Sequence, residues 1–277
     1  MLTPAQMHFQ KVMASRRCQP DEESRMTRTA HEQVMHHLRL AKSRLSGIQS
    51  NAAKAEIKKD LLPEFYGWID GTLEGDSGRQ DDIITTLMVW AIDCGDLPLA
   101  LRIGEYVVRH GLTMPDNFGR SAATVLTEEI CAPVLTLAAT DQDADLSGFI
   151  EPLDTLWGIV ANSDMPDQVR AKLCKACAFA RRASTDPETW GNSLKLLREA
   201  MHLDKNAGVK REIAALTRAL KKAPEIHDDT LKSDNAVVIE AKRHKKPRVS
   251  TPDKAATRKT SKTVKKASGK AAIQKQN

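Results

Sequence analysis

Apolar side chains recur at steps of three and four residues through most of positions 1–222, which is the spacing of one helix face. The clearest case is the segment 80–116, QDDIITTLMVWAIDCGDLPLALRIGEYVVRHGLTMPD, in which two apolar stripes flank an acidic corner. Asp96 stands where it can cap the second stripe, Pro98 falls in the first turn, and Gly111 follows the last apolar residues. The segment therefore predicts an αα-hairpin.

Capping signals and the same spacing predict helices along the rest of this stretch. The first helix begins near residue 4, because Thr3 and Gln6 have the spacing of a capping box, and a loop is predicted at 18–28. Further helices are predicted at residues 80–93, 97–110, 119–139, 148–161, 167–183, 188–203 and 207–221. We therefore expect an all-α protein with a helical N-terminal region, a body of helical hairpins and a C-terminal tail that lacks a helical pattern.

A heptad pattern lies in the N-terminal region. Its apolar positions alternate steps of four and three: Val34, Leu38, Ala41, Leu45, Ile48, Ala52 and Ala55. One interpretation is a single long helix packed on its own domain. The other is a coiled coil between chains, which would give the protein a route to a homo-oligomer.

Charge is distributed unevenly along the chain, although the formal net charge is only +6. Residues 1–59 carry 11 Lys and Arg against 5 Asp and Glu, residues 60–240 carry 18 against 30, and residues 241–277 carry 13 against 1. Such asymmetry is expected of a protein that meets a polyanion with its ends. The predicted regions are a basic helical region for DNA binding or oligomerisation at 1–62, an acidic helical body at 63–224 and a Lys-rich tail at 225–277.

Composition predicts a protein outside the membrane. No apolar run approaches the roughly 20 residues that a membrane-spanning helix needs, and the N-terminus lacks the basic and then apolar layout of a signal peptide. The 5 cysteines, an odd number, fit a reduced cytosol better than a disulfide framework.

The tail offers the clearest candidates for binding. Residues 241–277 contain no aromatic and almost no large aliphatic residue, so the tail should be disordered when free. Its candidate phosphate contacts are Lys242, Arg243, Lys245, Lys246, Arg248, Arg258, Lys259, Lys262, Lys265 and Lys266. These cations would give DNA affinity without sequence preference. A solubilising tail, or a contact for an acidic protein, is the alternative.

Four segments together carry a resemblance to a known family: LTPAQMHFQKVMASRR, LLPEFYGWI, the segment 80–116, and DPETWGNSLKLLREAMHLDKNAGVKREIAALTRALKK. In order and spacing the chain resembles the terminase small subunit, also described as the terminase endonuclease subunit, of temperate contractile-tailed phages of the Peduovirus type. The resemblance implies binding to double-stranded phage DNA at the cohesive-end site, a large ATPase subunit as partner, a homo-oligomer, and action in the host bacterial cytoplasm. A non-enzymatic, nonspecific DNA-coating or scaffold protein is the alternative.

The resemblance also directs attention to the N-terminal region, where terminase small subunits generally bind DNA. The candidate DNA contacts there are Arg16, Arg17, Arg39, Lys42, Arg44, Lys58 and Lys59. The alternative is a solvated helix face, since no helix-turn-helix of standard spacing is visible.

An endonuclease would need one or two Mg²⁺ ions held by carboxylates. The candidates are Asp81, Asp82, Asp93, Asp96, Glu128 and Glu129. The competing interpretation is structural, because Asp81 and Asp82 suit a helix N-terminus and Asp96 suits a cap. The sequence itself identifies neither the catalytic residues nor a metal site.

Overall fold

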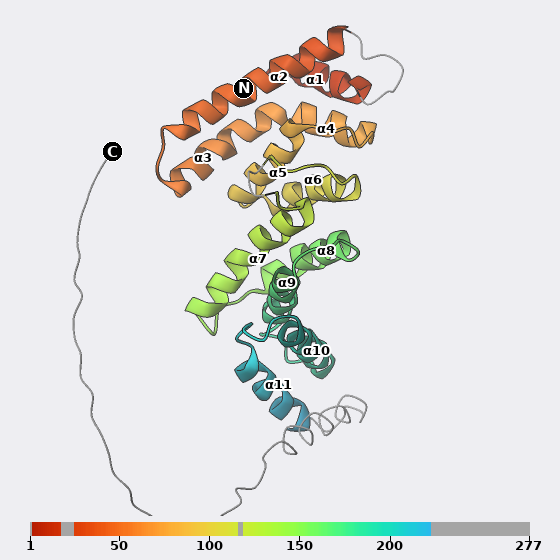
Figure 1. The fold of residues 1–277 in the computed structure, drawn as a ribbon. Coiled ribbons are helices and arrows are strands. Elements are labelled where there is room, and N and C mark those ends of the chain that lie inside the picture. Colours follow the sequence, from red (N-terminus) through yellow and green to blue (C-terminus); the bar gives the residue numbers. More distant parts are fainter. Residues whose placement is uncertain (1, 18–24, 116–118, 223–277) are drawn as a thin grey trace, which may run out of the picture. The chain divides into compact units, whose positions relative to one another are not determined.

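The computed structural model describes residues 2–17, 25–115 and 119–222, and helices are the only regular elements in these ranges. The helices are α1 (Pro4–Arg17), α2 (Arg25–Ser46), α3 (Asn51–Leu61), α4 (Tyr66–Gly75), α5 (Asp82–Asp93), α6 (Leu97–Arg109), α7 (Ala122–Thr140), α8 (Ile150–Val160), α9 (Asp167–Ala180), α10 (Pro187–Leu203) and α11 (Lys210–Lys222), with short 3-10 turns at Leu62–Phe65 and Ser147–Phe149 (Figure 1). The all-α prediction is confirmed. All described residues belong to one compact unit, residues 1–227.

Side-chain caps set where several helices begin. Thr3 and Gln6 form the predicted capping box, with the Thr3 amide donating to Gln6 Oε1 at 2.8 Å and the Gln6 amide donating to Thr3 Oγ1 at 3.3 Å. Asp96 accepts a hydrogen bond from the Leu99 amide at the start of α6. Because these signals are local, the helices α5 to α11 begin and end within about three residues of the predicted positions.

The heptad pattern does not form one long helix, so the first interpretation is wrong on continuity, whereas packing within the chain's own core is confirmed for Val34 to Leu45. α2 ends at Ser46, and α3 starts afresh after Ser50, whose side chain accepts from the Ala53 amide. Gly47 and this cap together break the helix. The first four apolar positions, from Val34 to Leu45, are buried in the chain's own core. α2 also starts at Arg25, inside the predicted loop, while residues 18–24 lie outside the described residues.

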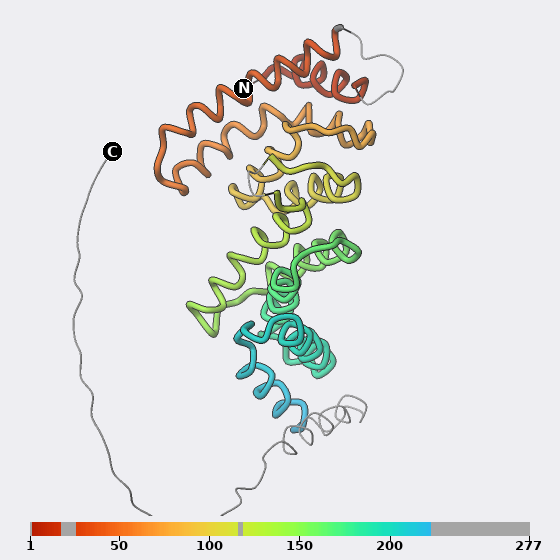
Figure 2. The backbone as a smooth tube through the Cα atoms, viewed as in Figure 1, coloured from red at the N-terminus to blue at the C-terminus, as the bar shows by residue number. Residues whose placement is uncertain are grey.

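α4 is absent from the predicted elements, and it contains two glycines in close contact with another helix. Gly67 and Gly71 lie one turn apart on the side of α4 that packs against α1 (Figure 2). A Cβ atom on Gly67 would come within 2.4 Å of the Met7 carbonyl oxygen, and one on Gly71 within 2.1 Å of the Lys11 carbonyl oxygen. Glycines that weaken helix propensity thus allow two helix backbones to meet.

The other helices pack mainly on neighbours in the chain: α5 on α6, α6 on α7 and α8, α7 on α9, α9 on α10, and α10 on α11. One hydrophobic cluster includes side chains from both sides of the boundary predicted at residues 62 and 63. Within the described residues, α7 has the length and apolarity to cross a membrane, yet 56% of that stretch is buried against the rest of the protein, as in a core helix of a soluble protein.

Candidate nucleic-acid interface

Three of the seven basic candidates in the N-terminal region are bonded to side chains on other helices or at their caps. Arg17 Nη1 donates to Asp81 Oδ2 at 3.0 Å. Lys42 Nζ donates to Thr86 Oγ1 at 3.1 Å, and burial lowers the pKa of Lys42. Lys58 forms an ion pair with Asp93 and lies 5.9 Å from the centre of the Trp90 ring. These cations stabilise contacts between helices, and Arg17 and Lys58, whose side chains are 14% and 15% exposed, have little freedom to meet phosphates, whereas Lys42 remains exposed.

The other four candidates remain available to a ligand. Arg16 at the end of α1, Arg39 and Arg44 on α2, and Lys59 on α3 are exposed, and none forms an ion pair within the described part of the chain. α2 and α3 are consecutive helices joined by the turn at 47–50 (Figure 1). The tail candidates from Lys242 to Lys266 lie outside the described residues.

Asp81 is the one acidic side chain among the buried residues of the described structure. It is 2% exposed, and its oxygens accept from Arg17 Nη1, Trp68 Nε1 at 2.9 Å and the Ile83 amide at 2.9 Å. His31 Nε2 lies 3.7 Å away. Asp81 therefore caps α5 and links it to α1, α2 and α4.

The protonation of Asp81 follows from these contacts. Burial alone would raise the pKa of Asp81, but the nearby His31, the positive charge of Arg17 and the hydrogen bond from Trp68 outweigh it. The pKa therefore lies below its usual value, and Asp81 is ionised at neutral pH.

The other carboxylate candidates are dispersed. Asp82 is exposed and accepts from Gln80 Nε2 at 3.2 Å, while Asp93 and Asp96 lie at the opposite end of α5. At 1.5 Å per residue, about 18 Å of helix separates Asp81 from Asp93, which is too far for one metal ion. Within the described residues, no group of three or more His, Cys, Asp or Glu side chains is placed to hold a metal ion.

Glu128 and Glu129 lie further along the chain, on α7. Glu128 is held between Lys172 Nζ at 2.9 Å and Arg120 Nη1 at 3.2 Å, and the hydrogen bond from Lys172 is the main reason that its pKa is lowered. Glu129 is exposed. The structure therefore gives Glu128 a role in joining α7 to α9.

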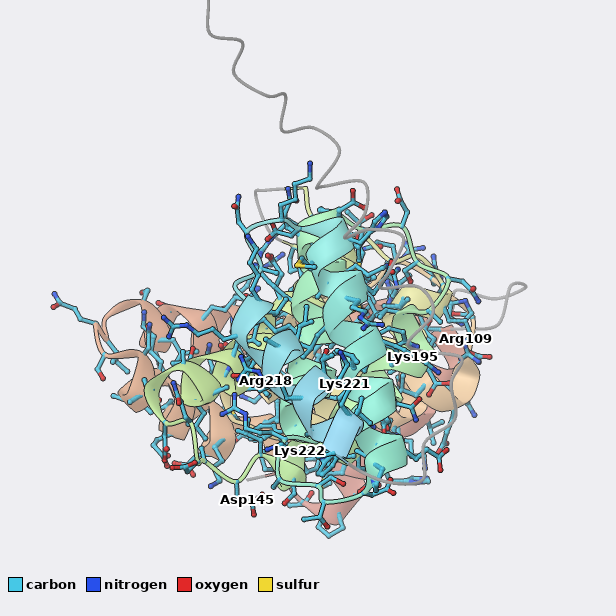
Figure 3. All side chains as sticks on the ribbon, turned by 90° about the horizontal axis from the view of Figure 1, so that it is seen from below. Arg109, Asp145, Lys195, Arg218, Lys221 and Lys222 are labelled. Carbon is cyan, nitrogen blue, oxygen red and sulfur yellow. The ribbon has the colours of Figure 1, made fainter. Side chains whose placement is uncertain are left out.

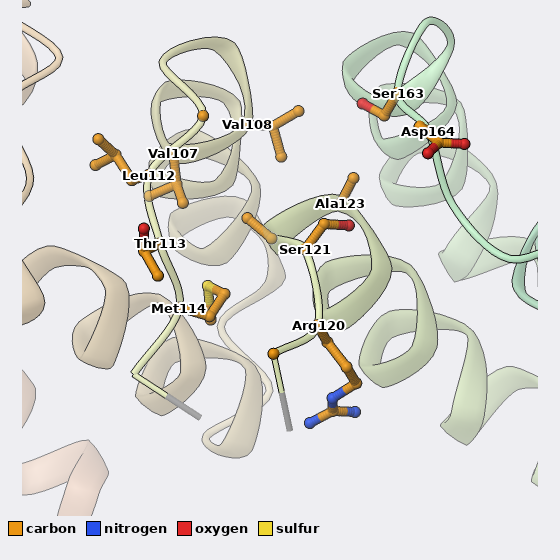
Figure 4. Close-up of a pocket in the computed structure, with 13 residues that line it drawn as sticks. Val107, Val108, Leu112, Thr113, Met114, Arg120, Ser121, Ala123, Ser163 and Asp164 are labelled. Atoms are coloured by element: carbon orange, nitrogen blue, oxygen red, sulfur yellow. The ribbon is translucent and has the colours of Figure 1, made fainter. Parts of the chain in front are cut away.

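A pocket of about 490 Å³ lies between the end of α6 and the start of α7 (Figure 4). Leu112, Met114 and Ala123 supply apolar lining, and Ser121 Oγ, which also lines it, already accepts from the Thr124 amide as the cap of α7. Arg120 at the rim is bonded to Glu128. Among the described residues that line it, no catalytic set of side chains is brought together.

Comparison with known proteins places the chain among phage packaging proteins. The family model described as phage small terminase subunit matches residues 35–168. The chain is 37% identical over 225 residues to a protein of Escherichia phage P2 named "Terminase, endonuclease subunit", and the match covers 81% of this chain and 88% of that protein. No solved structure matches the chain.

Proposed function

Because the chain belongs to the phage small terminase subunit family, we propose that it binds the cohesive-end site of concatemeric viral DNA through α1 to α3 and assembles there as a homo-oligomer. Small terminase subunits act in viral DNA packaging with DNA and a large subunit as partners, and phage terminases work in the cytoplasm of the host bacterium. The observation that supports the assignment to α1 to α3 is the set of four exposed cations, Arg16, Arg39, Arg44 and Lys59, that form no ion pair within the described residues.

The proposal divides the work of DNA binding between two regions. Cations fixed on helices hold a defined position along a duplex, whereas the cations at 241–277 supply affinity that is independent of sequence. The acidic residues of the body would repel DNA, so its surface is the natural one for the large subunit. A nonspecific coating protein would have no such division.

Removing three of the helical cations should test this assignment. In the variant Arg39→Ala/Arg44→Ala/Lys59→Ala we expect weaker binding to cohesive-end DNA, and a salt dependence whose log–log slope is smaller by up to about 2.7, at about 0.9 for each phosphate contact. Fluorescence anisotropy over a series of salt concentrations measures both, and sedimentation of the same samples should give a mass above the 30.6 kDa of one chain.

A control variant removes the same charge from exposed ion pairs of the body. It is Arg102→Ala/Arg109→Ala/Lys172→Ala, whose partners are Asp70, Asp76 and Glu128. Exposed pairs contribute about 0–1 kcal/mol each, so the control should fold. Equal losses of DNA affinity in the two variants would mean that only total charge matters and would contradict the proposed interface.

We also propose, from the printed name of the phage P2 relative, that the chain takes part in DNA cleavage as a subunit of the assembled terminase. With Mg²⁺ and a supercoiled plasmid that carries the cohesive-end site, we expect nicking by the chain plus its large subunit and none by the chain alone. The exposed carboxylates Asp82 and Asp93 should tolerate alanine, because each has one side-chain partner at the protein surface. Nicking by the pure chain that is lost in Asp82→Ala would instead place the nuclease in this subunit.

A further inference from the structure

α11 has two chemically distinct sides. Ile213 and Leu216 are half-buried against the core, and the only acidic residue of the helix, Glu212, lines a small cavity on the same packed side with Arg182 and Ser193. The opposite side therefore carries no acidic side chain from α11 itself. This arrangement concentrates the cations of the helix on its solvent face.

The solvent face of α11 is a row of cations separated by alanine. Arg211, Ala215, Arg218 and Lys222 follow one another at steps of four, three and four residues, and all four are exposed. At 1.5 Å per residue, Arg211 and Lys222 are about 16 Å apart along the helix. That length corresponds to about five phosphates along one strand of a duplex, at about 3.4 Å each.

Two further cations flank this row. Lys221 is exposed on α11, and Lys195 is exposed on α10, the helix against which α11 packs. Seen end-on, Lys195, Arg218, Lys221 and Lys222 gather over these two helices (Figure 3). Like charges at this spacing repel one another, and none of these side chains forms an ion pair within the described ranges.

We propose that this basic face of α11, made by Arg211, Arg218, Lys221 and Lys222 with Lys195 of α10, is a second contact for the DNA backbone. The proposal rests on the DNA-binding function proposed above and adds a site inside the region predicted as an acidic body. Although residues 60–240 carry more acidic than basic side chains, residues 187–222 carry 8 Lys and Arg against 4 Asp and Glu.

The composition of the face favours DNA over a protein partner. Protein interfaces bury a core of apolar or aromatic side chains, whereas the solvent face of α11 offers only alanine between its cations. Repeated cations without an apolar core match the regular charge of a phosphate backbone. The basic tail at 241–277, with its 13 Lys and Arg, is separated in sequence from this face by residues 223–240, which carry 5 Asp and Glu against 1 Lys.

The test uses the full chain with Arg211→Ala/Arg218→Ala/Lys222→Ala, which keeps good helix formers at exposed positions. Titrated with a 30-bp duplex, with and without the cohesive-end sequence, this variant should bind both duplexes at least about tenfold more weakly. The two duplexes should be affected alike, because backbone contacts carry no sequence information. The log–log salt slope should be smaller by up to about 2.7, at about 0.9 for each phosphate contact removed. The triple variant of Arg102, Arg109 and Lys172 is again the control and should keep wild-type binding.

Three other results would have distinct meanings. If the wild-type chain fails to bind either duplex, the proposed function itself fails. If the chain binds DNA, and the α1 to α3 variant is weakened while the α11 variant keeps the wild-type affinity and salt slope, this inference alone is overturned. If the α11 variant binds DNA normally but no longer associates with the large subunit, the face is a protein contact and the inference is also overturned.

Discussion

Replacing Gly71 with alanine is expected to lower the free energy of unfolding by about 3 kcal/mol, the upper end of what overpacking a close contact costs. The added Cβ would lie 2.1 Å from the Lys11 carbonyl oxygen and 2.7 Å from Ala14 Cβ. A backbone oxygen cannot rotate away as a long side chain can. Relief therefore requires α1 to move off α4, which loses contacts along the whole length of the helix pair. Urea unfolding followed by circular dichroism measures the difference.

Gly158→Ala makes the same chemical change in a helix where there is room for it. Gly158 lies in α8, and nothing comes within 4 Å of an added Cβ. Alanine there should stabilise the protein by up to about 1 kcal/mol, because helical glycine costs backbone entropy. If both variants changed stability equally, the close packing of α1 on α4 would not be the cause.

The variant Asp81→Asn should lower the free energy of unfolding by about 3–5 kcal/mol, the range found when one partner of a buried ion pair is removed. The side chains of Arg17 and Asp81 are only 14% and 1% exposed, so Arg17 would keep a poorly solvated charge without its partner. Asparagine caps helices as well as aspartate does, so the bond to the Ile83 amide can persist. The NH2 group of asparagine cannot accept from Trp68 Nε1, so the loss would report the charge and the Trp68 hydrogen bond rather than the cap.

Asp96→Asn provides the matched comparison, since Asp96 caps α6 without a buried cation and the variant should lose only a few tenths of a kcal/mol of stability.

The pH dependence of the free energy of unfolding is a second test of the role of Asp81. Its pKa is lower in the folded than in the unfolded protein, so its stabilising effect is complete above the unfolded value, about 3.9, and disappears as the pH falls towards the folded value. The difference in free energy of unfolding between the wild type and Asp81→Asn should therefore become smaller below about pH 4. If that difference did not change with pH, ionisation of Asp81 would not be the cause of the lower stability of the variant.

Local chemistry explains what could be predicted from the sequence. Four of the helices from α5 onward, α5, α6, α7 and α10, begin at side-chain caps such as Asp96. All of these later helices show their apolar spacing within a single window, so their limits follow from neighbouring residues. α4 was not among the predicted helices. Its Gly67 and Gly71 lower helix propensity, and their close contacts are with α1, about 60 residues earlier in the chain. Only the tertiary contact distinguishes a glycine that breaks a helix from one that lets another helix approach.

The candidate site shows the same limit. The sequence identifies the basic residues of the N-terminal region, but it cannot tell that Arg17 and Lys58 are bonded to Asp81 and Asp93 while Arg39 and Lys59 form no ion pair in the described part of the chain. Those pairings join residues 64 and 35 positions apart. The basic face of α11 was missed for a different reason, because a net charge summed over 60–240 averages a cationic helix into an acidic region. A count made helix by helix would have found it.

The contacts of Asp81 also affect how mutations that block packaging should be interpreted. Arg17 is the immediate neighbour of Arg16, so a change at position 81 disturbs the end of the very helix that carries a candidate phosphate contact. A genetic selection for lost packaging would therefore recover position 81 alongside true DNA contacts, although its side chain is enclosed by protein. Suppressors of such alleles should map to α1, α2 and α4, whereas suppressors of mutations at a true DNA contact should map to the viral DNA site.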